Sequence, residues 1–232
     1  MDFSSKNGSY SGDRTRQMVF IGMLCAIAYI SIFIFNGKIP LVPAVSFLTY
    51  DPKDIVIIFG GFIYGPFTCF VISFVVAFFE MITISKDGIV GFIMNVIAAS
   101  AFTCTAAFIY KINKKYNKIF GAVAGLFLGC LAMTGIMAAW NYIITPVYLN
   151  MPREAVVEML PAITLFNILK SGINFAVIMI LYAPLMKMVK SLKISEAVEN
   201  VKKVRINIGV IQTLLLLVIT VILVILALLK KI

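Results

Sequence analysis

A lysine and two asparagines share one face of the long apolar segment from Leu160 to Met186. At about 100° per residue, Asn167, Lys170 and Asn174 fall within an arc of roughly 60° on a helix. Carboxamides pair with the edges of heteroaromatic rings and with hydroxyls, and an ammonium donates to oxygens. The pattern predicts a ligand-binding face. The alternative for the asparagines is hydrogen bonding between helices.

The depth of Lys170 makes contact with lipid unfavourable. At about 1.5 Å per residue it lies roughly 15 Å from the start of the apolar segment, near the middle of a bilayer. A lysine there costs about 2.5–3.5 kcal/mol on insertion scales. No carboxylate in the adjoining apolar segments is an evident partner. We therefore expect a ligand, water or backbone carbonyls to satisfy the ammonium.

The composition places these residues in a membrane protein with several helices. Of the 232 residues, 62% are hydrophobic, and the mean hydropathy is +1.04, whereas soluble domains are nearer half apolar. The net charge of +10 sits in patches between apolar segments, a pattern that sets membrane orientation and does not suggest nucleic-acid binding. Four cysteines within apolar segments and the absence of histidine argue against disulfides and a metal site.

The first apolar segment, residues 17–35, follows a polar stretch with two arginines. We interpret residues 1–16 as a disordered cytoplasmic tail. Gly22 and Ala26 are four residues apart, and Ala28 adds a third small side chain. This spacing lets another helix approach closely. The face packs either within the same chain or against a partner.

An apolar loop over residues 36–50 separates this segment from the next. Such a loop beside a cavity can act as a lid over an aromatic ligand, with Phe47 and Leu48 as apolar walls. The alternative is a loop lying on the lipid interface. Asp51 after the loop predicts a helix start, with Asp51 as the cap and Asp54 near the positive end of the dipole.

Topology divides the uncharged stretch from Ile55 to Phe79 into two helices. The arginines of residues 1–16 and the four lysines of residues 111–118 should both be cytoplasmic, so an even number of crossings must separate them. A break at Gly65-Pro66 gives four crossings. The sequence therefore predicts a short second helix over residues 53–64 and a third over 66–84.

Three further spans carry more candidates for the same pocket: residues 89–110, 119–146 and the segment from Leu160. Asn95 and Asn141 lie at similar depths from the expected outer side, and Trp140 is either a pocket wall or an interfacial residue. Glu80, near the outer end of the third helix, faces either the cavity or the interface. Glycines at 121, 125 and 129 mark a close helix contact, and residues 147–159 form an external loop.

We therefore expect an all-α polytopic membrane protein: a cytoplasmic tail (1–16), a six-span substrate-binding domain (17–190), a basic cytoplasmic connector (191–205) and a C-terminal transmembrane helix (206–232). Seven crossings place the N-terminus in the cytoplasm and the C-terminus outside the cell.

In order and together, these features resemble the substrate-binding S component of an energy-coupling factor (ECF) vitamin transporter, and within that family the riboflavin-specific type. The resemblance covers about residues 15–190. The segments that carry it are FLTYDPKD (47–54), GGFIYGP (60–66), GFIMN (91–95) and NILK (167–170). The seventh segment departs from the six-helix family pattern.

The resemblance implies a multi-pass subunit of a prokaryotic plasma membrane that binds riboflavin, or a related flavin, with high affinity from the extracellular side. Riboflavin would be cargo, with no cofactor and no enzymatic activity. The implied partners are a transmembrane coupling subunit, which docks on Gly22, Ala26 and Ala28, and two ATPase subunits; toppling of the whole subunit would release the substrate inward. The implied substrate-binding residues are Asn95, Asn141, Asn167, Lys170, Asn174, Phe47, Leu48, Thr49, Tyr50 and Glu80.

Other function classes fit the sequence less well. The same polar groups suit an S component for a different vitamin. A stand-alone secondary transporter of a neutral heteroaromatic molecule usually has inverted repeats or ionisable relays, and neither is visible here. A membrane-embedded enzyme has few candidate catalytic groups, because histidine and paired carboxylates are missing from the pattern. No phosphate-binding loop for ATP occurs either.

Overall fold

The computed structural model describes residues 4–35, 39–85, 87–113 and 117–191. These ranges contain no strand, and their elements are α1 (Ser4–Phe35), the short 3-10 helix η1 (Pro43–Val45), α2 (Lys53–Tyr64), α3 (Pro66–Thr83), α4 (Gly88–Asn113), α5 (Lys118–Tyr148) and α6 (Arg153–Ser191). Five helices within the described part are long and apolar enough to cross a membrane. The all-α polytopic class is confirmed. The predicted helix over 206–232 lies outside the described residues, as does the connector beyond residue 191.

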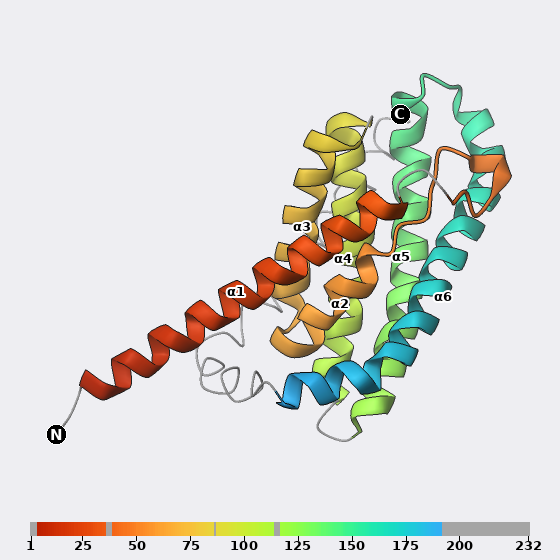
Figure 1. Ribbon diagram of the computed structural model, residues 1–232. Coiled ribbons are helices and arrows are strands. Elements are labelled where there is room, and N and C mark those ends of the chain that lie inside the picture. The colour runs from red at the N-terminus through yellow and green to blue at the C-terminus, as the bar shows by residue number, and fades with distance from the viewer. Residues whose placement is uncertain (1–3, 36–38, 86, 114–116, 192–232) are drawn as a thin grey trace, which may run out of the picture.

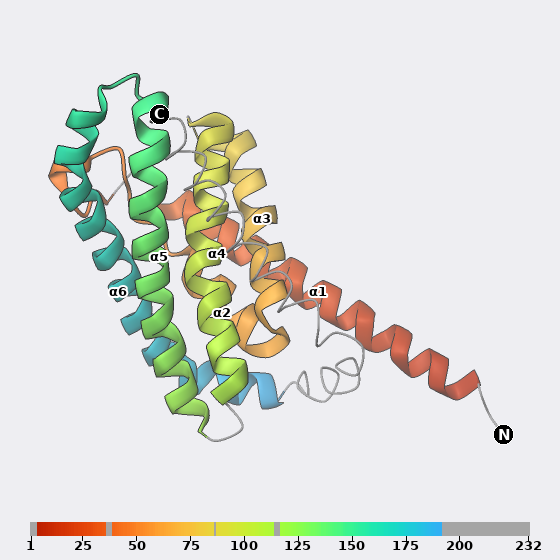
Figure 2. The ribbon, with the colours of Figure 1, turned by 180° about the vertical axis from the view of Figure 1, so that it is seen from behind.

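The helices form a bundle that α1 crosses obliquely (Figure 1). Seen from behind, α5 lies between α4 and α6 (Figure 2), and both neighbours contact it. The short helix α2 packs among α1, α3 and α4. The loop after α1 runs to α6, where η1 contacts that helix. This loop and α6 are therefore the elements that bring the start of α2 close to Lys170.

The predicted break at Gly65-Pro66 is confirmed. Gly65 has a φ of 105°, a conformation that glycine adopts without the steric penalty of a side chain. Pro66 then begins α3, where its missing N–H leaves no intrahelical bond unmade. The second helix has the bounds expected from the sequence, Lys53–Tyr64.

Two expected boundaries are wrong. The chain is helical from Ser4, so residues 4–16 are not the unstructured tail that their composition suggested; no proline interrupts the stretch to end the helix. The expected external loop over 147–159 is short, because α6 already begins at Arg153. Pro152 precedes that start, and Glu154 lies in the first turn, both favourable at a helix N-terminus.

Helix α1 has an inner and an outer face. Leu24, Ala28 and Ile32 are buried at intervals of four residues, and Ala28 is 0% exposed. Ala28 therefore packs within the chain, and its predicted place on a docking surface is wrong. Gly22 and Ala26 are exposed on the other face, where a second chain can reach them.

The predicted close contact of the α5 glycines is confirmed at Gly125 and Gly129. A Cβ atom at Gly125 would lie 2.5 Å from the backbone oxygen of Ala106, and one at Gly129 would lie 2.6 Å from the backbone oxygen of Phe102. Both neighbours belong to α4. The missing side chains let the two helix backbones pack directly together.

Gly129→Ala is expected to lower the free energy of unfolding by about 1–3 kcal/mol, because the added methyl overpacks the contact with α4. The matched control is Gly135→Ala in the same helix, where nothing lies within 4 Å of the new Cβ. Alanine favours a helix by about 1 kcal/mol over glycine, so the control should be neutral or stabilising. Thermal unfolding in detergent compares the two, and equal melting temperatures would contradict the packing argument.

Candidate functional site

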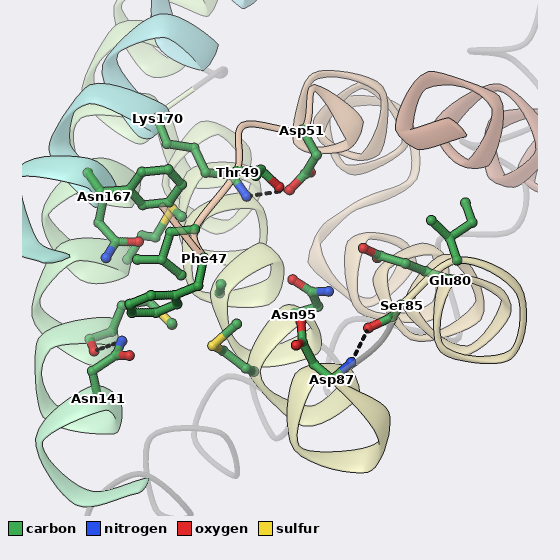
Figure 3. Close-up of a pocket in the computed structure, with 17 residues that line it drawn as sticks. Phe47, Thr49, Asp51, Glu80, Ser85, Asp87, Asn95, Asn141, Asn167 and Lys170 are labelled. Atoms are coloured by element: carbon green, nitrogen blue, oxygen red, sulfur yellow. Dashed lines mark hydrogen bonds and ion pairs between the residues drawn. The ribbon is translucent and has the colours of Figure 1, made fainter. Parts of the chain in front are cut away.

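A cavity of about 370 Å³ lies between the loop after η1 and helices α3, α4, α5 and α6. Its volume falls within the range typical of small-molecule sites, about 300–1,000 Å³. Eight of the ten substrate-binding residues expected from the sequence line it: Phe47, Leu48, Thr49, Glu80, Asn95, Asn141, Asn167 and Lys170. Figure 3 shows Asn141 and Asn167 on one side of the cavity and Asn95 on another. The folded chain thus gathers residues from five separate segments.

The asparagines of α5 and α6 are held in place by their own helices. The side-chain amide of Asn141 donates to the carbonyl of Met137 at 2.8 Å, and that of Asn167 donates to Ile163 at 2.8 Å. The Asn141 oxygen accepts a bond from Thr145 at 2.9 Å. Within the described residues, no group donates to the Asn167 oxygen, so it is available to a ligand.

Lys170 is paired with a carboxylate. Its Nζ lies 2.7 Å from Oδ2 of Asp51, and the residue is only 5% exposed. The sequence-based expectation that no carboxylate would meet this lysine is wrong, because the partner comes from a loop and not from a neighbouring span. Asp51 is also not the expected helix cap: Pro52 occupies that position, with no side-chain cap bond.

Lys53 extends this interaction to the third helix. Its Nζ donates to Oε2 of Glu80 at 2.8 Å and lies 3.7 Å from Oδ1 of Asp51. Glu80 therefore faces the cavity, one of the two alternatives left open by the sequence. Together with Asp54, which is 1% exposed, these residues form what we call the ionic cluster: Asp51, Lys53, Asp54, Glu80 and Lys170.

The charge state of Asp51 follows from its surroundings. Burial raises the pKa of its carboxyl, but the ammonium groups of Lys170 and Lys53 outweigh burial and hold the pKa below its ordinary value. Asp51 is therefore ionised at neutral pH. The cluster has three carboxylates and two ammonium groups, so a full set of ionised groups leaves an excess of negative charge.

Two expected site residues lie behind the cavity. Asn174 is 0% exposed, accepts a hydrogen bond from the Tyr50 hydroxyl at 2.9 Å and donates to Oδ2 of Asp54 at 3.2 Å. Neither Tyr50 nor Asn174 lines the cavity. Asn174 lies one helical turn beyond Lys170, where α6 meets the start of α2. The helix face on which Asn174 lies was predicted correctly, but its side chain bonds to Tyr50 and Asp54 of the same chain and does not face the cavity.

Most of the apolar residues that line the cavity were not predicted from the sequence. Phe166, Met94, Met133 and Met137 line the cavity, whereas Trp140 does not. Met133, Met137 and Asn141 are four residues apart on one face of α5, a spacing that could have revealed them. Methionine side chains adapt to irregular shapes and pack well on aromatic rings.

Asp87 adds a carboxylate at the cavity edge. It lies between α3 and α4, is exposed, and accepts a hydrogen bond from the Tyr148 hydroxyl at 2.8 Å. The sequence analysis assigned this residue no role. Figure 3 shows Asp87 with Ser85 and Asn95 on the same side of the cavity.

Comparison with known proteins agrees with this architecture. The family described as the ECF transporter substrate-specific component matches residues 16–182. The riboflavin transporter FmnP of Bacillus subtilis is 31% identical over 138 residues, which cover 58% of this chain and 70% of FmnP. A solved S component of a bacterial ECF transporter superposes with a TM-score of 0.64 at 28% identity, over 76% of this chain and 99% of that structure. Since the family match spans more than half of the sequence and includes all residues around the cavity, the chain belongs to the substrate-specific S components of ECF transporters.

Proposed function

We propose that this S component binds riboflavin, or a closely related flavin, in the cavity between the loop and α3 to α6. The observation that carries the proposal is the lining itself: the carboxamides of Asn95, Asn141 and Asn167 surround one chamber that also has apolar walls. The similarity of this chain to the riboflavin transporter FmnP supports the same ligand class.

The chemistry of a flavin suits this lining. Its ring is flat and largely apolar, with amide-like edges, and its tail carries hydroxyl groups. Carboxamides donate and accept at both kinds of group. Phe47, Leu48 and Phe166 offer apolar surface to the ring, as is usual for sites that bind flat organic ligands.

We further propose that the bound vitamin enters from outside the cell and is taken up with ATP hydrolysis by ECF partners. These are a transmembrane coupling subunit and two ATPase subunits, with the N-terminus of this chain in the cytoplasm. The exposed Gly22 and Ala26 of α1 are the proposed contact with the coupling subunit, since small residues let a second helix approach closely.

The proposal is tested by titrating a panel of vitamins with the purified protein. We expect saturable quenching of riboflavin fluorescence with one site per chain, and a yellow preparation after growth with the vitamin. Binding of another vitamin without any flavin binding would assign a different S-component substrate. Uptake by this chain alone in vesicles, without ATP, would favour a secondary transporter.

Asn167 and Asn174 are expected to respond differently to alanine. Asn174→Ala leaves the Tyr50 hydroxyl and the Asp54 carboxylate without a buried partner, so it should lower the free energy of unfolding by about 1–3 kcal/mol. Asn167→Ala removes a cavity-facing amide, so it should weaken flavin binding about fivefold to tenfold with a smaller stability change.

Thermal unfolding and fluorescence titration of both variants check this prediction. The two variants serve as controls for one another, because they make the same substitution two turns apart on α6. If Asn174→Ala weakened binding more than Asn167→Ala without any loss of stability, the assignment of Asn174 to the framework behind the cavity would be wrong.

A further inference from the structure

The charged side chains that line the cavity are mostly negative in the part of the chain that the structure describes. Among the described residues that line it, three are carboxylates and one is an ammonium: Asp51, Glu80, Asp87 and Lys170. Lys53 is 2% exposed and bonds to Glu80 from behind the lining. Among these described residues, a ligand in the cavity therefore meets more negative than positive charge.

The Lys170 ammonium in the cavity is already paired with a carboxylate. Lys170 contacts Asp51 at 2.7 Å, and the Asp51 side chain is only 13% exposed, so a second anion would have to displace this carboxylate from the ammonium. The residue before Asp51 is held by two hydrogen bonds: the Tyr50 amide donates to the backbone oxygen of Ile39, and the Tyr50 hydroxyl donates to Asn174. The ion pair is thus built into the folded chain.

We propose that Asp51 sets the charge selectivity of this S component: by neutralising Lys170, it makes the cavity select uncharged flavins and reject flavins that carry a phosphate. The inference rests on the proposed function and deepens it. A phosphate monoester carries a charge of about −1.5 to −2 at pH 7. Like charges placed together in a partly desolvated site oppose binding strongly.

The first test compares riboflavin with its 5′-phosphate, FMN, on the wild-type full-length protein by fluorescence quenching. The two ligands share the same ring and differ in the phosphate. The dissociation constant of FMN should exceed that of riboflavin by at least about tenfold, as expected for like-charge repulsion. Equal constants would overturn the inference while leaving flavin binding established. If neither flavin binds, the proposed function itself fails, and the inference fails with it.

The second test is Asp51→Asn, which keeps the shape of the side chain and frees the Lys170 ammonium. The ratio of the FMN and riboflavin constants should shrink by at least about fivefold, mainly through tighter FMN binding. The matched control is Glu158→Gln, which removes one negative charge from an exposed position of α6 away from the cavity. The control should keep the wild-type ratio. An equal change in both variants would indicate a general charge effect and overturn the role of Asp51.

A third variant keeps the inference testable if Asp51→Asn does not fold. Asp87 is exposed, and among the described residues its carboxylate bonds only to Tyr148, so Asp87→Asn should fold normally. It should reduce the ratio by about twofold to threefold, less than Asp51→Asn, because an exposed charge is screened by solvent. If Asp51→Asn does not fold and Asp87→Asn leaves the ratio unchanged, the carboxylates of the cavity do not select against phosphate.

Discussion

Lys170→Met is expected to lower flavin affinity by about tenfold to a hundredfold while the protein still inserts into the membrane. A hydrogen bond from a charged donor contributes about 1.5–3 kcal/mol, which corresponds to this range. A second effect acts in the same direction. Without Lys170, the nearest ammonium to Asp51 among the described residues is that of Lys53 at 3.7 Å, so the cavity gains uncompensated negative charge beside the oxygens of the ligand.

The double variant Lys170→Met with Asp51→Asn separates these two effects. It removes the donor but also removes the carboxylate that the single variant leaves poorly paired. If the ammonium donates to the flavin, affinity stays low in the double variant. If only the unpaired Asp51 weakens binding, affinity returns towards the wild-type value. Fluorescence titration gives the constants, and size-exclusion profiles in detergent check the fold. Unchanged affinity in Lys170→Met would remove Lys170 from the site.

Much of the helical framework was predictable because its signals are local. The pair Gly65-Pro66 marks a helix boundary through backbone geometry alone, and the glycines of α5 mark a close contact through their spacing. The start of α6 at Arg153 was missed, since the charged residues 153–158 read as an external loop although they suit the first turns of a helix.

The site was predictable only in part, for a related reason. Helical periodicity identifies which residues share a face, and it placed Asn167 and Lys170 correctly. It does not identify what a loop brings to that face. Asp51 meets Lys170 from 119 positions away in the sequence, so the pairing depends on the fold of the loop. Asn174 shows the same limit. It lies on the predicted face of α6, but it contacts Asp54 at the start of α2, whereas Lys170, one turn earlier, lines the cavity.

Ala26→Trp is expected to abolish uptake without changing flavin binding. Ala26 and Gly22 are exposed on α1, while Leu24 and Ala28 hold the opposite face of the helix against the bundle. An indole on the exposed face does not disturb the core or the cavity. It prevents the close approach of a partner helix, for which small residues are required. Uptake should therefore fall at least about tenfold, as expected when bulk blocks a closely packed contact between helices.

The matched control is Ile180→Trp, which places the same indole on α6 at a residue that is 74% exposed. Both variants enlarge an outward-facing side chain within a candidate membrane span, so a general effect of tryptophan on insertion would appear in both. Labelled riboflavin uptake in cells that contain the ECF partners, together with titration of the purified proteins, distinguishes the outcomes. Loss of uptake in Ala26→Trp alone, with unchanged affinity, assigns the exposed face of α1 to partner contact. Normal uptake in Ala26→Trp would show instead that the coupling subunit meets another face of the bundle.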